Sequence, residues 1–198
     1  MSTGRELAKR LTIVTIAAMA AGTLEARACG FERPVDQQRG FLNWIYPDSF
    51  HISTAIWQGQ QKGMLGRDPA LQSSSKLLVN PAYRKTMATL TIFAQRFEVG
   101  REGSNGKSFV VLLLEPMLWT RIEPGKGALS LTVHINQPTE GEPVLITERV
   151  VLEALNRGVV SFEQANQEGY LRIYGDEVGI AEVRRSFARI SPKPANES

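Results

Sequence analysis

The sequence predicts a mixed α+β domain built on mostly antiparallel strands. Residues 81–99 keep helical spacing, with apolar side chains three or four positions apart. Four strand-like segments then follow in close succession, at 108–115, 118–122, 129–135 and 144–147. Because the apolar stripe of the helix must be buried, we expect this helix to pack on the sheet that the strands form.

Ahead of this core, the turn-forming sequence at 46–49 predicts the start of a further helix. Residues on one face of that helix would be Ile52, Ala55, Ile56 and Gly59, and Gly63 suits its end. Apolar residues also alternate from 50 to 56, so a short strand fits this stretch as well. The serine, glycine and charged residues of 66–75 predict a linker.

The helix at 81–99 has the clearest signals. Asn80 is the expected cap, and Pro81 suits the first helical position because the N–H that proline lacks needs no partner there. The apolar stripe consists of Tyr83, Met87, Leu90, Phe93, Ala94 and Phe97. It ends near Val99, where we expect the helix to end.

Two short helices are predicted after the strand at 144–147. Thr147 is expected to cap the first of them, and Gly158 to end it. Ser161 and Gln164 have the spacing of a capping box, which predicts a second helix immediately afterwards.

A strand and a helix are expected to complete the domain. Leu171 and Ile173 alternate with their neighbours after Gly169, which predicts a strand. Asp176 is expected to start the last helix, whose apolar face would be formed by Ile180, Val183, Phe187 and Ile190. Residues 191–198, with two prolines, predict a disordered tail.

The first 28 residues have the order of a Sec-type signal peptide. Basic residues precede an apolar run at 11–24, and Ala26-Arg27-Ala28 supplies the small-x-small pattern that signal peptidase accepts. The run is shorter than the roughly 20 residues that a membrane-spanning helix needs. We therefore expect cleavage after Ala28 and export to the periplasm or out of the cell, with a retained N-terminal anchor as the alternative.

Cys29 would be the first residue of the exported chain. A cysteine that follows a small residue is also what lipoprotein peptidase requires, so lipoprotein anchoring through an acylated Cys29 stays open, although Glu25 and Arg27 are unusual at such sites. Cys29 is the sole cysteine, which excludes an intrachain disulfide.

The charge of the exported chain argues against a nucleic-acid partner. Removing residues 1–28 takes away four of the 23 basic side chains and two of the 20 acidic ones, which leaves 19 against 18. A nearly neutral domain lacks the positive field on which nonspecific nucleic-acid binding depends.

The catalytic patterns in the sequence are incomplete. Residues 103–108 resemble the end of a phosphate-binding loop, but Arg101 occupies the position of its first glycine, and a helix precedes the loop where a strand is required. Asp48, Ser49 and His51 have the residue types of a nucleophilic triad, yet they lie too close in sequence to converge, and helix capping explains the first two.

The two histidines do not indicate a metal site. His51 and His134 lie in different elements, and neither has a second histidine or a cysteine at ligand spacing. We expect His134 on the polar face of the strand at 129–135, together with Ser130, Thr132 and Asn136. The sequence therefore predicts neither an enzyme activity nor a cofactor.

The C-terminal region also has a recognisable order of elements. The strand ending in Leu145-Ile146-Thr147 leads to a helix at 151–155 and to Gly158-Val159-Val160-Ser161. Gly169-Tyr170-Leu171-Arg172-Ile173 and Gly175-Asp176 follow. This succession resembles the C-terminal half of the sterol carrier protein 2 (SCP2) family over about 60 residues, with the helix at 81–99 as a counterpart of the family's first helix.

The resemblance implies helices on one face of a mostly antiparallel sheet, around an apolar cavity for lipid-like ligands. Residues that would converge on that cavity are Leu155, Phe162, Leu171, Ile173 and Phe187. The same side chains could instead fill a solid core, because an empty apolar space costs stability unless a ligand occupies it. Residues 29–79 have no counterpart in the family.

The predicted organisation is a signal peptide at 1–28, an N-terminal helical segment with a linker at 29–75, an SCP2-like domain at 76–190 and the tail at 191–198. Two functions remain open. The first is an exported, non-catalytic protein that binds a hydrophobic or lipid-like molecule. The second is a periplasmic accessory module without a ligand cavity, in which Trp44, Tyr46 and Trp57 dock on an envelope protein.

Overall fold

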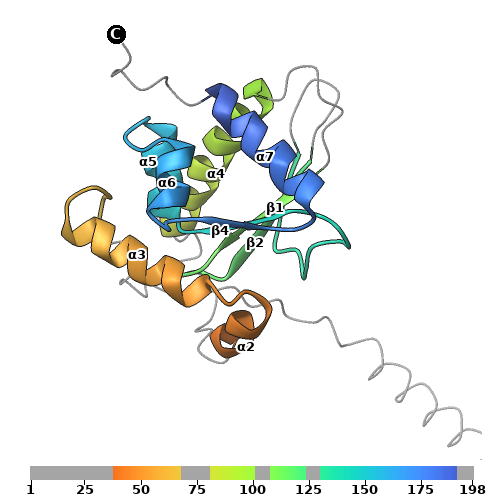
Figure 1. Ribbon diagram of the computed structural model, residues 1–198, viewed down its shortest axis with the longest axis horizontal. Helices are drawn as coiled ribbons and strands as arrows, with labels where there is room; N and C mark the ends of the chain where they lie inside the picture. The colour runs from red at the N-terminus through yellow and green to blue at the C-terminus, as the bar shows by residue number, and fades with distance from the viewer. Residues whose placement is uncertain (1–37, 68–80, 101–107, 124–129, 191–198) are drawn as a thin grey trace, which may run out of the picture.

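The computed structural model describes residues 38–67, 81–100, 108–123 and 130–190, and its centre is a five-stranded sheet (Figure 1). The strands are β1 (Phe109–Leu113), β2 (Leu118–Glu123), β3 (Ser130–Val133), β4 (Val144–Thr147) and β5 (Arg172–Tyr174), in the order β3-β2-β1-β4-β5. Neighbouring strands are antiparallel except β1 and β4, which run parallel at the centre. Together with the helices, this sheet confirms the predicted α+β class.

Four helices lie on one side of the sheet, as Figure 1 shows. They are α4 (Pro81–Gly100), α5 (Arg149–Asn156), α6 (Phe162–Gln167) and α7 (Glu177–Ile190). The α4 stripe meets the sheet where the rings of Phe97 and Phe109 lie 4.4 Å apart. The predicted capping box of α6 is present, with the backbone N–H of Gln164 donating to Ser161 Oγ at 3.1 Å.

The N-terminal helices α2 (Gln38–Ile45) and α3 (Ser49–Gln61) lie on the opposite side of the sheet (Figure 1). Tyr46, between these helices, packs on Trp119 and Tyr174. Trp119 pairs with Leu112 and Tyr174 pairs with Val144, and these residues lie on the face of the sheet that points away from α4. With both faces covered, every residue of β1 and β4 is buried, and their continuous apolar runs meet this requirement.

Two close contacts fix α3 in place. A Cβ atom at Gly59 would lie 2.8 Å from the hydroxyl oxygen of Tyr170, so glycine permits the approach of α3 to that buried ring. The hydroxyl of Tyr174 donates to the carboxylate of Asp48 at 2.8 Å. The helical alternative for 49–63 is therefore correct, and Gly63 follows the helix with a φ of 73°.

Local predictions were wrong at three places. Thr147 does not cap α5: it is the last residue of β4, its hydroxyl donates to the Tyr170 carbonyl at 2.9 Å, and Glu148 holds the N-cap position. Asp48 holds the N-cap position of α3, but its side chain makes no capping hydrogen bond, since its carboxylate binds Tyr174. His134 lies beyond the end of β3, with a φ of 59°, and its ring stacks on Tyr83 of α4.

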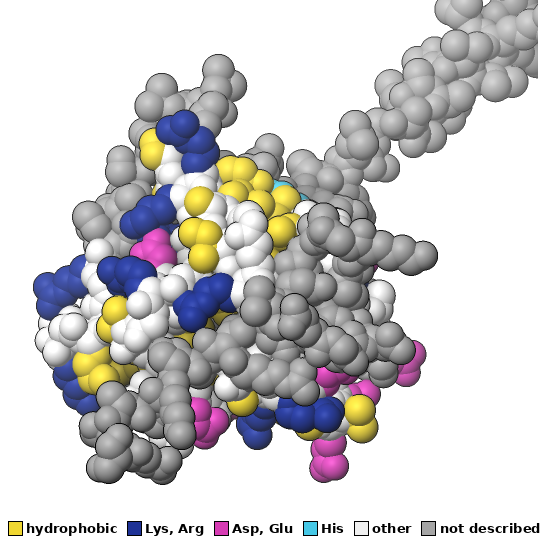
Figure 2. Space-filling view, turned by 90° about the horizontal axis from the view of Figure 1, so that it is seen from above, with side chains coloured by type: hydrophobic (Ala, Val, Ile, Leu, Met, Phe, Trp, Pro, Cys, Tyr) yellow, Lys and Arg dark blue, Asp and Glu magenta, His cyan; other side chains and the backbone are white. Residues whose placement is uncertain are grey.

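Several predictions fall outside the described residues. These are the signal peptide and the site at Ala28 and Cys29, most of the linker at 66–75, the Asn80 cap, the loop at 101–107 and the tail at 191–198. Within the described residues, no helix combines the length and apolarity needed to cross a membrane. On the face shown in Figure 2, Lys and Arg side chains are interspersed with apolar and acidic ones.

Candidate functional site

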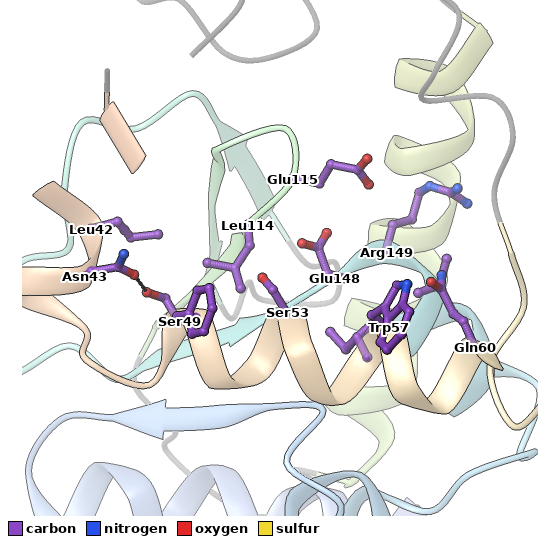
Figure 3. Close-up of a pocket in the computed structure, with 13 residues that line it drawn as sticks. Leu42, Asn43, Ser49, Ser53, Trp57, Gln60, Leu114, Glu115, Glu148 and Arg149 are labelled. Carbon is purple, nitrogen blue, oxygen red and sulfur yellow. Dashed lines mark hydrogen bonds between the residues drawn. The ribbon is translucent and has the colours of Figure 1, made fainter. Parts of the chain in front are cut away.

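A pocket of about 430 Å³ lies between α3 and the ends of β1 and β4. Because β1 and β4 are parallel neighbours, the residues that follow them emerge at the same edge of the sheet. Leu114 and Glu115 follow β1, while Glu148, Arg149 and Val150 follow β4. Helix α3 crosses below this edge and forms the opposite wall of the pocket (Figure 3).

The wall of the pocket is apolar over much of its surface. Buried side chains that contribute to it are Leu42, Ile56, Leu114 and Val150. Phe50 and Trp57 also line the pocket, one helical turn on either side of Ser53, and both rings are largely exposed to solvent. These two aromatic side chains therefore lie where the pocket meets the surface.

Charged groups concentrate on the side of the pocket formed by the strand ends. Glu115, Glu148 and Arg149 lie there, across from Ser53 and Gln60 of α3 (Figure 3). Arg149 is buried and pairs with Glu153 one turn along α5. Burial lowers the pKa of Arg149, and Glu153 opposes that shift, so the guanidinium stays charged.

Asn43 and Ser49 supply neutral polar groups at the α2 end of the pocket. The Ser49 hydroxyl donates to the side-chain oxygen of Asn43, as the dashed line in Figure 3 marks. The pocket therefore has an apolar middle between a neutral polar end and a charged side. Such an arrangement suits a ligand that is itself apolar with a polar group.

The five residues predicted from the SCP2 resemblance lie elsewhere. Leu155, Phe162, Leu171 and Phe187 are buried and Ile173 partly so, all within one continuous core cluster. The rings of Phe162 and Phe187 are stacked with centroids 4.1 Å apart. None of the five lines the pocket beside α3. That they bind a ligand stays a prediction.

The other predicted residues are also separated. Trp44 and Trp57 are exposed, but Tyr46 is buried against Trp119 and Tyr174 of the sheet and does not belong to a docking surface. Ser49 and Asp48 have different partners, Asn43 and Tyr174, so no triad with His51 is assembled from them. Within the described part of the chain, no three potential metal ligands come together.

Sequence reasoning missed the residues at the strand ends. Glu115, Glu148 and Arg149 are far apart in the sequence, and only the parallel pairing of β1 with β4 brings them to one edge. One signal was available: an arginine at the start of the apolar helix 149–156, two residues after the end of a buried strand, needs a buried partner or a pocket.

No protein-family model and no curated protein matches the chain. Among solved structures, the chain is similar to the solution structure of a conserved hypothetical protein from Thermus thermophilus, described as "possibly sterol carrier protein". The identity is 12% and the TM-score 0.32, with 63% of this chain and 97% of the other covered. A TM-score this low identifies neither a family nor a ligand.

Proposed function

We propose that this chain is an exported, non-catalytic protein that binds a hydrophobic or lipid-like molecule in the pocket beside α3. The observation that carries the proposal is the pocket itself, about 430 Å³ of space between α3 and the ends of β1 and β4. Ligand pockets of proteins span roughly 300–1,000 Å³ and combine apolar walls with a few polar groups. This pocket has both properties.

The lining favours an amphipathic ligand. Ile56, Leu114 and Val150 offer apolar contact to a hydrocarbon part, and Phe50 and Trp57 extend that surface to the opening. Each buried CH₂ group contributes about 0.8 kcal/mol to binding, before the costs of association. A polar end of the ligand would meet the charged side of the pocket.

Export is the second part of the proposal. It is supported by the basic start, the apolar run at 11–24 and the small-x-small pattern ending at Ala28. All the elements that build the pocket follow this segment, since α2 begins at Gln38. The binding domain would therefore remain whole after cleavage and work in the periplasm or outside the cell.

Filling the pocket tests the proposal. Ser53 faces the pocket from α3 and is exposed, so Ser53→Phe places a ring inside without a buried polar group to replace. We expect the variant to fold as the wild type does and to lose at least tenfold in affinity for the apolar fluorophore N-phenyl-1-naphthylamine, because the ring occupies the ligand's space. Fluorescence titration measures the affinity.

Thr54→Phe is the matched control. Thr54 is the next residue on α3, is also exposed and does not line the pocket. It adds the same apolar ring to the same helix, so we expect unchanged uptake. Equal uptake by wild type and Ser53→Phe, or equal losses in both variants, would refute the pocket as the ligand site.

A further inference from the structure

Exposed aromatic side chains concentrate on the N-terminal helices. Trp44 is 87% exposed, Phe50 67% and Trp57 59%, and Ile45 and Met64 are exposed as well. These five are among the eight large hydrophobic side chains that are exposed in the described residues. Tryptophan is normally among the more buried residues. Phe50 and Trp57 are seven residues apart on α3, so they share one face of that helix, and a contiguous exposed apolar patch marks an interaction surface.

The charges of this segment restrict its partner. Residues 38–67 contain Arg39, Lys62 and Arg67 and a single acidic residue, Asp48. The acidic residues of the pocket, Glu115 and Glu148, lie on its other side, at the strand ends. The carboxylate of Asp48 accepts a hydrogen bond from the Tyr174 hydroxyl at 2.8 Å. Tryptophan and basic side chains together are the composition of surfaces that bind the interface of a bilayer with anionic lipids.

The chain leading to these helices gives a second reason for a membrane. The apolar run at 11–24 ends 14 residues before Gln38, the first residue of α2, and Cys29 lies nine residues before it. Fourteen residues reach about 50 Å at most when fully extended. An acyl group on Cys29, which is compatible with cleavage after Ala28, would hold α2 and α3 near the bilayer.

We propose that α2 and α3 form a membrane-docking surface that seats Trp44, Phe50 and Trp57 among anionic phospholipids. Phe50 and Trp57 belong both to this surface and to the pocket lining. Docking therefore places the pocket opening against the lipid, and an amphipathic molecule reaches the pocket from the bilayer without crossing water. This last step rests on the function proposed above, whereas docking itself does not.

Vesicle binding tests the docking surface. The chain from residue 29 to 198, made without an acyl group, is mixed with vesicles of equal parts phosphatidylethanolamine and phosphatidylglycerol and then sedimented. We expect wild-type protein to bind, with its tryptophan emission shifted to the blue and quenched by brominated lipid. The double variant Trp44→Ser with Trp57→Ser should bind at least tenfold more weakly, because it removes two interfacial anchors.

Val159→Ser with Val178→Ser is the matched control, since these side chains are 59% and 67% exposed but lie outside α2 and α3. Its vesicle binding should equal that of wild type. Failure of wild-type protein to bind, or equal losses in both double variants, would overturn the proposal. So would stoichiometric copurification of one envelope protein through Trp44 and Trp57 with no vesicle binding.

Ser53→Phe separates the two proposals: it should lose fluorophore uptake while keeping vesicle binding.

Discussion

Replacement of Phe187 by alanine is expected to destabilise the protein by about 3–5 kcal/mol. Its ring is stacked on Phe162 at 4.1 Å and lies 5.1 Å from Phe93 and 5.0 Å from Phe97. The Phe187 ring therefore connects α7 to α4 and α6. Its removal leaves a cavity among three rings, which cannot all shift to fill it. Urea unfolding of the wild type and the variant measures the difference.

Phe50→Ala provides the comparison, because it removes the same ring from an exposed position on α3. Its effect on folding stability should stay within about 0.5 kcal/mol. If Phe187→Ala costs less than about 1 kcal/mol, the ring borders open space. That result would favour the ligand cavity predicted around Leu155 and Phe162 over a filled core.

Glu142→Ala is expected to cost about 3 kcal/mol, near the lower end of the range for breaking a buried ion pair. The carboxylate of Glu142 is buried and accepts from Arg121 Nε at 2.8 Å and Nη2 at 3.0 Å. It also accepts from the backbone N–H of Thr139 at 2.9 Å. Its loss leaves the partly buried Arg121 guanidinium without this partner. Glu140→Ala, an exposed change in the same turn, should have little effect.

The same site predicts how stability depends on pH. Burial raises the pKa of Glu142, but hydrogen bonds from Arg121 and Thr139 outweigh burial, and the pKa lies below its ordinary value of 4.5. A lowered folded-state pKa means that this stabilisation is complete above pH 4.5 and is lost as the pH falls toward the folded-state pKa. Glu142→Gln removes this titration, so its stability should fall less steeply on acidification.

Urea unfolding of wild type and Glu142→Gln across about pH 6 to 3 provides the measurement. The two stability curves should converge as the pH falls, because protonated Glu142 and glutamine both lack the negative charge. Parallel curves throughout would mean that Glu142 contributes nothing to acid sensitivity.

Features that depend on neighbouring residues could be predicted from the sequence. The capping box of Ser161 and Gln164 is present, and Gly158 and Gly169 have positive φ where the helices end. The stripe of α4 was also correct, since Leu90, Phe93 and Phe97 are buried. In each case the residues that carry the signal and the structure that they form lie within a few positions of each other. The helical period, the capping spacing or the conformation of a glycine is then enough to predict the structure.

Features that depend on distant contacts could not be predicted. The parallel pairing of β1 with β4 follows from competition among five strands, for which the sequence holds no local signal. Thr147 and Asp48 have side chains that commonly cap helices, but such groups also form hydrogen bonds with other neighbours. Here Thr147 bonds to the Tyr170 carbonyl, and Asp48 accepts from the Tyr174 hydroxyl. The pocket could not be predicted either, because its lining comes from α3 and from the residues that follow β1 and β4, which are distant in the sequence.

The position of a bound apolar molecule tests the central claim most directly. The chain from residue 29 to 198, labelled with ¹⁵N, is titrated with N-phenyl-1-naphthylamine and followed by amide chemical shifts. Binding beside α3 predicts the largest shifts at Ser53, Trp57, Leu114 and Val150, which line the pocket. Largest shifts instead at the core residues Leu155, Phe162, Leu171, Ile173 and Phe187 would contradict it.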